Sequence, residues 1–163
     1  MSVFDRLDEL GLTLPPVVST VAAYVPAVRS GQLIYTSGQL PIVEGQLLQI
    51  GKVGAEVTPE QAKNLARQCA LNALAAVNGL VGLENVRGIV KVVGFVASAE
   101  NFTGQPTVIN GASELLVAVF GNAGEHARTA VGVAELPLNA PVEVELIVST
   151  ELGAIDKFMR VWD

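Results

Sequence analysis

The sequence predicts an α+β protein in which two helices pack on one face of a mixed β-sheet. The first observation is the element order, β-β-(β)-α-β-α-β-β, because strands and helices that alternate only in the middle disfavour a doubly wound parallel sheet. The second is composition: 163 residues that are 50% hydrophobic can bury a full core. The third is that only 16% are charged, against about 25% in typical domains, which indicates order and also oligomerisation. We expect one domain over residues 1–163.

The N-terminal residues 2–10 are expected to form a short amphipathic helix. Ser2 is a suitable N-cap and Gly11 a suitable end. An extended linker follows at Leu14–Pro16, since proline restricts the residue before it. The apolar stripe of the helix would consist of Val3, Phe4, Leu7 and Leu10.

Strands are predicted from runs of β-branched and apolar residues bounded by Gly, Pro and Ser. A turn at Arg29–Gly31 is expected to join the first two, and a Pro-bounded turn at Leu136–Pro141 the last two. In the last strand, alternation gives one apolar face that should pack on the helices. The expected strands are Val17–Val28, Leu33–Ser37, Leu47–Ile50, Ile89–Ala97, Ala127–Leu136 and Val142–Ser149.

Two long helices are expected between the strands. The first begins at Thr58-Pro59-Glu60-Gln61, where Thr58 is an N-cap, proline fits the first turn, and Gln61 completes a capping box. Gly79 and Gly82 would end it, and Cys69 on its apolar stripe is expected to be a buried small hydrophobe. The second covers residues 106–120. The tail from Glu151 to Asp163 is expected to form a short helix bearing Phe158 and Trp162.

Charge and composition exclude several classes of function. The net charge is −6 and no Lys/Arg cluster occurs, which argues against nucleic-acid binding. One cysteine and one histidine allow neither an internal disulfide nor a Cys/His zinc site. The longest uncharged run contains three prolines, and the N-terminus does not resemble a signal peptide, so we expect a cytoplasmic protein without a membrane span.

Arg128 is the first candidate for chemistry. Alternation places Arg128, Ala130 and Gly132 on one face of their strand, so the guanidinium has room beside it. A hairpin through the Leu136–Pro141 turn would put Arg128 opposite Ser149, on the face that carries Glu143 and Glu145 but roughly 20 Å from Glu143. Arg128 would then either bind a ligand or form a salt bridge with a glutamate, and direct contact would need another register, a bulge or a second subunit. His126 is expected to be an exposed turn residue.

Four blocks of sequence, in this order, resemble the RidA/YjgF family, whose members are also called endoribonuclease L-PSP-like proteins. The resemblance covers roughly residues 20–149, with the N-terminal helix and the C-terminal tail as additions. The blocks are GQLIYTSGQLP (31–41), TPEQAKNLARQCALNALAAV (58–77), VVGFVASAENF (92–102) and HARTAVGVAELPLNAPVEVELIV (126–148).

The resemblance implies a chorismate-mutase-like fold and a homotrimer whose sheets form a central barrel with clefts between subunits. It also implies hydrolysis of reactive 2-imino or enamine acids to 2-oxo acids and ammonia, without metal or cofactor. Arg128 would then grip the substrate carboxylate and Glu143 would activate water. Tyr24, Ser37 and Gly38 would line the cleft, and Asn110 would lie at the neighbouring subunit's side of it.

The sequence departs from the family pattern at two positions. Ala130 stands where many members have cysteine, so only a backbone role is left there, and His126 stands where proline is usual. These departures indicate a divergent subgroup. We therefore keep a non-catalytic metabolite- or partner-binding module as the alternative to a deaminase, with an endoribonuclease third because of the acidic charge.

Overall fold

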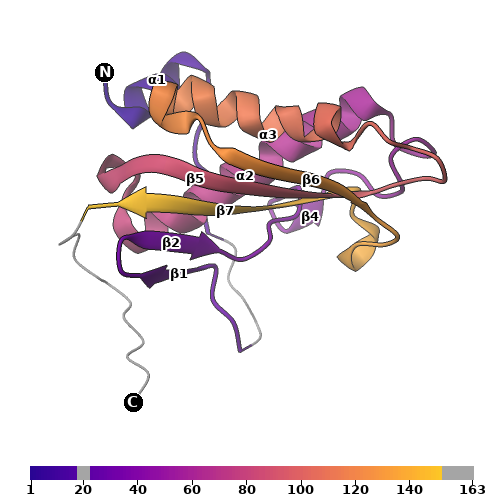
Figure 1. Cartoon of the computed structure of the whole chain (residues 1–163), viewed down its shortest axis with the longest axis horizontal. Coiled ribbons are helices and arrows are strands. Elements are labelled where there is room, and N and C mark those ends of the chain that lie inside the picture. The colour runs from indigo at the N-terminus through magenta and orange to yellow at the C-terminus, as the bar shows by residue number, and fades with distance from the viewer. Residues whose placement is uncertain (18–22, 152–163) are drawn as a thin grey trace.

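The computed structural model describes residues 1–17 and 23–151 as a five-stranded sheet covered on one face by two long helices (Figure 1). The strand order is β1-β2-β7-β5-β6, and a separate β3-β4 hairpin lies beside the sheet. The predicted α+β class is confirmed. The helices are α1 (Val3–Glu9), α2 (Pro59–Val81) and α3 (Gln105–Phe120), and the strands are β1 (Ala27–Ser30), β2 (Leu33–Thr36), β3 (Ile42–Val43), β4 (Gln46–Leu47), β5 (Val86–Ala97), β6 (Ala127–Val133) and β7 (Val142–Thr150).

The expected hairpin between the last two strands is wrong. Strand β5 lies between β6 and β7, pairing parallel to β6 and antiparallel to β7. The connection after β6 crosses the end of β5, where the Ser98 N–H donates to the Val133 carbonyl and the Ala97 N–H to the Pro141 carbonyl. Arg128 therefore lies beside Val92 of β5 rather than opposite Ser149 of β7.

The helix signals read from the sequence correspond to real helix ends. Thr58 caps α2 and forms the predicted capping box with Gln61, while Gly79 lies inside the helix and Gly82 ends it. Ser2 caps α1 in a second capping box, and Leu7 is buried against the core. Phe4 and Leu10 of the expected stripe are instead exposed. The predicted C-terminal helix lies outside the described residues.

Several strand boundaries differ from those expected. The strand expected at Val17–Val28 is β1, at Ala27–Ser30, and residues 18–22 lie outside the described part. The turn that follows begins at Gly31, whose φ of +60° suits glycine. The third strand is a short hairpin rather than Leu47–Ile50, because Pro41 and Gly45 limit its two strands to two residues each.

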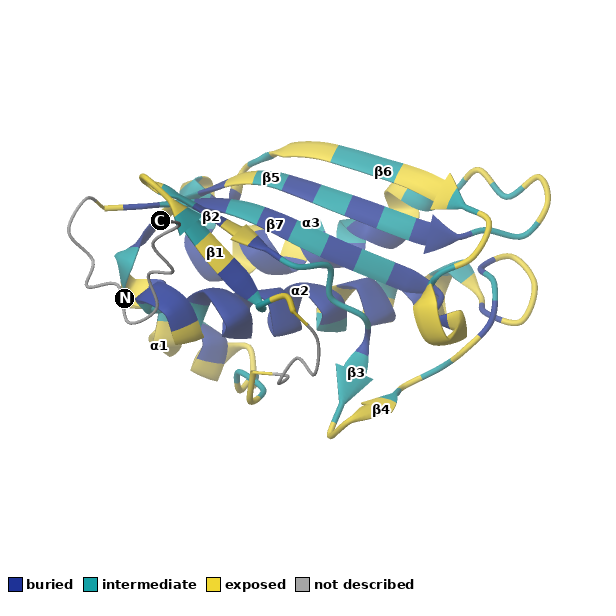
Figure 2. Cartoon of the chain, turned by 90° about the horizontal axis from the view of Figure 1, so that it is seen from below, coloured by how far each residue is buried: buried dark blue, intermediate teal, exposed yellow. Residues whose placement is uncertain are grey.

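The core lies between the sheet and the two long helices. Along β7 the buried residues alternate with half-buried ones, as predicted, and Figure 2 shows the same alternation over residues 92–96 of β5. A Cβ on Gly94 would overlap the side chain of Ile109, so α3 lies directly on β5. A Cβ on Gly111 would overlap the Lys63 carbonyl, so α2 and α3 also approach closely there. The buried β7 residues are Val142, Val144, Leu146 and Val148.

Cys69 is buried in this core, as expected, with its Sγ 3.7 Å from the Val142 carbonyl oxygen. Burial raises the pKa of the thiol well above its usual value, which makes it unreactive. None of the described helices is long and apolar enough to cross a membrane.

Candidate functional site

Arg128 extends from the edge strand β6 onto α3. Its Nη1 donates to Asn110 Oδ1 at 2.8 Å and to Ser113 Oγ at 3.3 Å. Asn110 and Ser113 are three residues apart on α3 and therefore share a helix face. Arg128 thus lies on the helix side of the sheet, which corrects the prediction that it shares a face with Glu143 and Glu145.

The sequence brings α3 close to Arg128 through small residues. Ala130 and Gly132 continue the helix-side face of β6 and leave no large side chain between the strand and α3. Gly111 packs closely on α2, and this contact fixes the position of α3 at the neighbouring Asn110. The space that small residues leave beside Arg128 is therefore occupied by α3 rather than left open.

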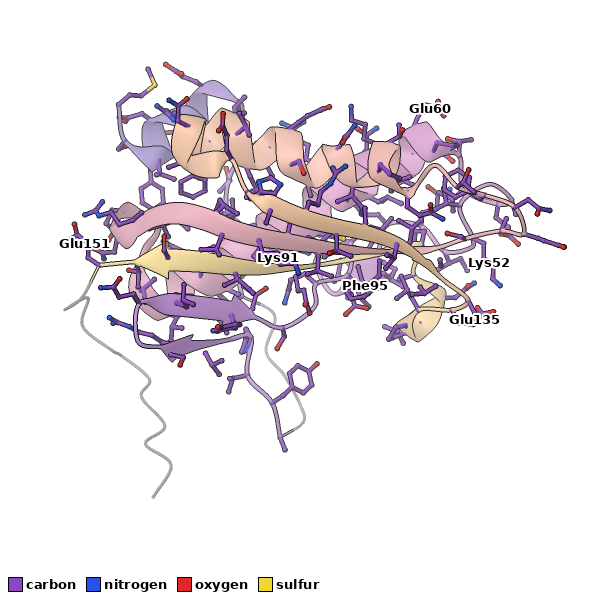
Figure 3. All side chains as sticks on the ribbon, in the orientation of Figure 1. Lys52, Glu60, Lys91, Phe95, Glu135 and Glu151 are labelled. Atoms are coloured by element: carbon purple, nitrogen blue, oxygen red, sulfur yellow. The ribbon has the colours of Figure 1, made fainter. Side chains whose placement is uncertain are left out.

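Arg128 has no carboxylate partner among residues 1–17 and 23–151. The ion pairs described there are Lys52–Glu135, Lys63–Glu114 and Arg87–Glu151, and Figure 3 shows Lys52 and Glu135 at one end of the molecule with Glu151 at the other. The salt bridge weighed for Arg128 does not form within the described chain. Both Nη1 hydrogens go to α3, and within the described residues the edge of the exposed guanidinium formed by Nε and Nη2 makes no hydrogen bond.

Glu143 lies on the opposite face of the sheet. It is in register with Phe95, near the C-terminal end of β5, on the side of the molecule where Figure 3 also shows Lys52 and Glu135. A Cβ on Gly38 would overlap Glu143 Oε1, so the carboxyl group rests directly on that glycine. Burial, and secondarily the charge of Glu145, raise the pKa of Glu143. A raised pKa makes this carboxylate a stronger base toward a water molecule than an ordinary glutamate is.

The segment that carries Gly38 is held against β7 by its neighbours. The Gln39 N–H donates to the Val144 carbonyl, and the Val144 N–H donates to the Gln39 carbonyl. Ser37 Oγ donates to the Val25 carbonyl at 2.6 Å. Ser37 and Gly38 are therefore fixed beside Glu143, while Tyr24, just before this contact, is 58% exposed.

One chain therefore separates the candidate residues into two groups. The arginine group, Arg128 and Asn110, lies at the β6–α3 edge, with the half-buried Ala130 beside it. The glutamate group, Glu143, Ser37 and Gly38, lies on the open face. Arg128 is in register with Val92 of β5, and Glu143 with Phe95, three residues further along the same strand. Three residues along β5 and two strand spacings across the sheet separate Arg128 from Glu143 by about 14 Å, and the two side chains lie on opposite faces. Asn110, expected at the neighbouring subunit's side of the cleft, bonds Arg128 in the same chain and therefore belongs with it to one group.

Two further residues connect to the arginine group through hydrogen bonds, and neither was selected as a site residue from the sequence. His126, expected in an exposed turn, is half-buried, with Nε2 2.9 Å from Ser113 Oγ and Nδ1 2.6 Å from the Gly124 carbonyl oxygen. Ser113 had one signal, its spacing of three residues from Asn110 in a helix. No group of three metal-ligating His, Cys, Asp or Glu side chains occurs in the described ranges.

Comparison with known proteins identifies the family. The family described as "YjgF/chorismate mutase-like, putative endoribonuclease" matches residues 4–150. Protein TCP17 of Trypanosoma cruzi is 42% identical over 90% of this chain and 92% of its own length. The 2-iminobutanoate/2-iminopropanoate deaminase of Escherichia coli K12 is 33% identical over 79% of this chain and 88% of its own. The crystal structure of a protein of unknown function from Agrobacterium tumefaciens is 46% identical, with a TM-score of 0.86 over 91% of this chain and 92% of that one. The chain, with this fold and these sequence matches, belongs to the RidA/YjgF family.

Proposed function

We propose that this protein hydrolyses small 2-imino acids, and their enamine tautomers, to 2-oxo acids and ammonia. The observation that carries the proposal is the Arg128 guanidinium, which is anchored on α3 through Nη1 and has no carboxylate partner in the described chain. Its Nε–Nη2 edge suits a bidentate bond to a carboxylate. The similarity to a 2-iminobutanoate/2-iminopropanoate deaminase supports a 2-imino acid as the owner of that carboxylate.

We propose further that two chains complete each site in a homotrimer. Arg128 and Asn110 would come from one subunit, and Glu143, with Ser37 and Gly38, from its neighbour. Support comes from the separation of the two groups, because one small substrate cannot bridge about 14 Å across a sheet.

The open face of the sheet gives a second argument for assembly. Val28, Tyr35 and Val131 on this face are 51%, 40% and 40% exposed. These apolar side chains come from β1, β2 and β6 and surround the half-buried Glu143 and Glu145. Exposed apolar side chains spread over one sheet face are typical of a surface that other subunits cover.

The chemistry follows from these placements. Arg128 would hold the substrate carboxylate, which fixes the adjacent imine carbon beside a water on Glu143. As the water oxygen bonds to that carbon, Glu143 takes a proton from the water, and the C=N electron pair moves to nitrogen, which takes a proton from solvent to give a carbinolamine. Glu143 then passes its proton to that nitrogen, the C–N bond breaks and ammonia leaves, while the carbinolamine hydroxyl releases its proton to solvent and becomes the carbonyl of the 2-oxo acid. Ala130 would contribute only its backbone.

The test is a coupled assay in which an amino-acid oxidase generates imines from several amino acids. We expect the wild-type protein to accelerate release of the 2-oxo acid and Arg128→Ala to lose about 10²-fold or more in kcat/KM while staying folded. The matched control is Arg87→Ala, which removes an exposed arginine paired with Glu151 and should leave the rate unchanged. Full activity of a folded Arg128→Ala variant would overturn the proposal.

The same assay separates the alternatives. Binding of 2-oxo acids without turnover would favour a metabolite-binding module, for which Ala130 is the supporting departure from the family pattern. Ribonuclease activity that persists through repurification would favour the function in the family's description. The net charge of −6 argues against that outcome.

A further inference from the structure

Ser113 and His126 form a hydrogen-bonded chain that ends on Arg128. We propose that they are positioning residues, which hold the Arg128 guanidinium with its Nε–Nη2 edge turned toward the substrate carboxylate. This inference rests on the proposed function and adds to it two residues that do not touch the substrate.

The direction of each hydrogen bond in the chain follows from chemistry. The Gly124 carbonyl can only accept, so His126 Nδ1, 2.6 Å away, carries a proton. In a neutral imidazole Nε2 then accepts, and the Ser113 hydroxyl, 2.9 Å away, donates to it. With its hydrogen so committed, Ser113 Oγ turns its lone pairs to Arg128 Nη1, from which it accepts at 3.3 Å.

The Gly124 end of this series of hydrogen bonds is held firmly by the backbone. Gly124 is buried, and a Cβ on it would overlap the Leu116 carbonyl oxygen, so its backbone is pressed against α3. The carbonyl that orients His126 therefore belongs to the same packed unit as Ser113 and Asn110. Each group in the chain is held by the next, and the first is held by backbone packing.

The hydrogen bonds through Ser113 and His126 set the plane of the Arg128 guanidinium. Asn110 alone would leave Arg128 free to turn about its single Nη1 contact. Ser113 takes the second Nη1 hydrogen, so two acceptors on one helix face define the orientation of the fork. Since Ser113 Oγ accepts a bond from a cation, its electron density is drawn away, which suits positioning rather than nucleophilic attack.

The first experiment requires no ligand. His126 is the only histidine, so its imidazole nitrogens give one pair of signals in a ¹⁵N NMR spectrum. We expect the Nδ1–H tautomer, and slowly rotating Arg128 Nη hydrogens in the wild type. Ser113→Ala and His126→Phe should lose the slow Arg128 signals, and Ser113→Thr, which keeps the hydroxyl, should retain them. An Nε2–H tautomer, or Arg128 signals unchanged in both variants, would overturn the inference.

The second experiment uses imine hydrolysis and 2-oxobutanoate binding. We expect Ser113→Ala and His126→Phe to raise KM and the Kd of 2-oxobutanoate about tenfold with kcat changed less than threefold, because carboxylate orientation is affected and the water site is not. Ser113→Thr should restore KM. The control is Glu114→Gln on the same helix, which loses only its exposed ion pair with Lys63.

The two failures are distinguishable. A wild-type protein that shows the ordered Arg128 signals but no turnover would contradict the proposed function and leave the positioning role standing. An active protein whose KM is the same in Ser113→Ala and His126→Phe would contradict the positioning role and leave the proposed function standing.

Discussion

Gly38→Ala is the substitution that most directly tests the position of the Glu143 carboxyl group. Gly38 is not in the left-handed region, so its backbone accepts alanine. The new Cβ would overlap Glu143 Oε1 and lie 2.8 Å from Cδ and 3.1 Å from Cγ. The carboxyl carbon would have to retreat by about 0.7 Å to reach an ordinary contact of about 3.5 Å, and the oxygen would have to move further.

Activity and stability should respond differently to this change. A displacement of about 1 Å of a group that holds the attacking water costs about 10²-fold in kcat/KM. Folding should change by only about 1 kcal/mol, or about 2–4 °C in Tm, because the displaced atoms are the free end of a side chain and alanine also stiffens the unfolded chain.

The assay is kcat/KM for imine hydrolysis together with a thermal melt. The matched control is Gly88→Ala, where the nearest atom to a new Cβ is Ser149 Oγ at 3.4 Å, an ordinary contact away from Glu143. Wild-type kcat/KM in Gly38→Ala, with a crystal structure showing Glu143 displaced, would refute the assignment of Glu143 to the reacting water.

Four further predictions concern the pH dependence of activity and stability, the N-terminal helix and the thiol. Glu145→Gln should lower the raised pKa of Glu143, so the acid limb of a kcat/KM–pH profile should move to lower pH; an unmoved limb would mean that Glu143 does not set it. The pKa of Glu143 is raised in the folded state, so the folded protein loses stability as the pH rises through that pKa and Glu143 ionises. Glu143→Gln should therefore raise Tm at neutral pH but not below about pH 4, as thermal melts at both pH values would show. Leu7→Ala should lower the free energy of unfolding by about 2–4 kcal/mol in urea titrations, because Leu7 is 2% exposed; a loss below about 1 kcal/mol would mean that α1 is not part of the core. Cys69 should react with a thiol reagent only as fast as the protein unfolds, and rapid labelling in native buffer would contradict its burial.

The layered fold could be predicted because its signals are local. The capping box at Thr58 fixes the start of α2, and alternation along residues 142–148 fixes the face of β7 that packs on the helices. The position of β5 could not be read in this way. A turn rich in proline between two strands is typical of a hairpin, and only tertiary pairing shows that this one crosses the end of β5.

The same crossover explains what was missed at the site. With β5 inserted, the side chain of Arg128 meets α3, so Asn110 and Ser113 become its partners in place of the glutamates. The contact of Gly38 with Glu143 joins residues more than 100 positions apart, which periodicity does not reveal. His126 looked like a turn residue because its partners, Ser113 and the Gly124 carbonyl, come from α3 and from a short helical turn whose packing depends on the fold.

The proposed function requires that Arg128 of one chain and Glu143 of another serve the same substrate. Its most direct test mixes two inactive variants, Arg128→Ala and Glu143→Ala, in equal amounts under conditions where subunits exchange. In randomly mixed trimers about a quarter of the clefts then combine an intact Arg128 with an intact Glu143, so we expect recovery of about 25% of wild-type kcat. Activity that stays at the level of the separate variants, although exchange is verified by mass spectrometry, would contradict a site shared between chains.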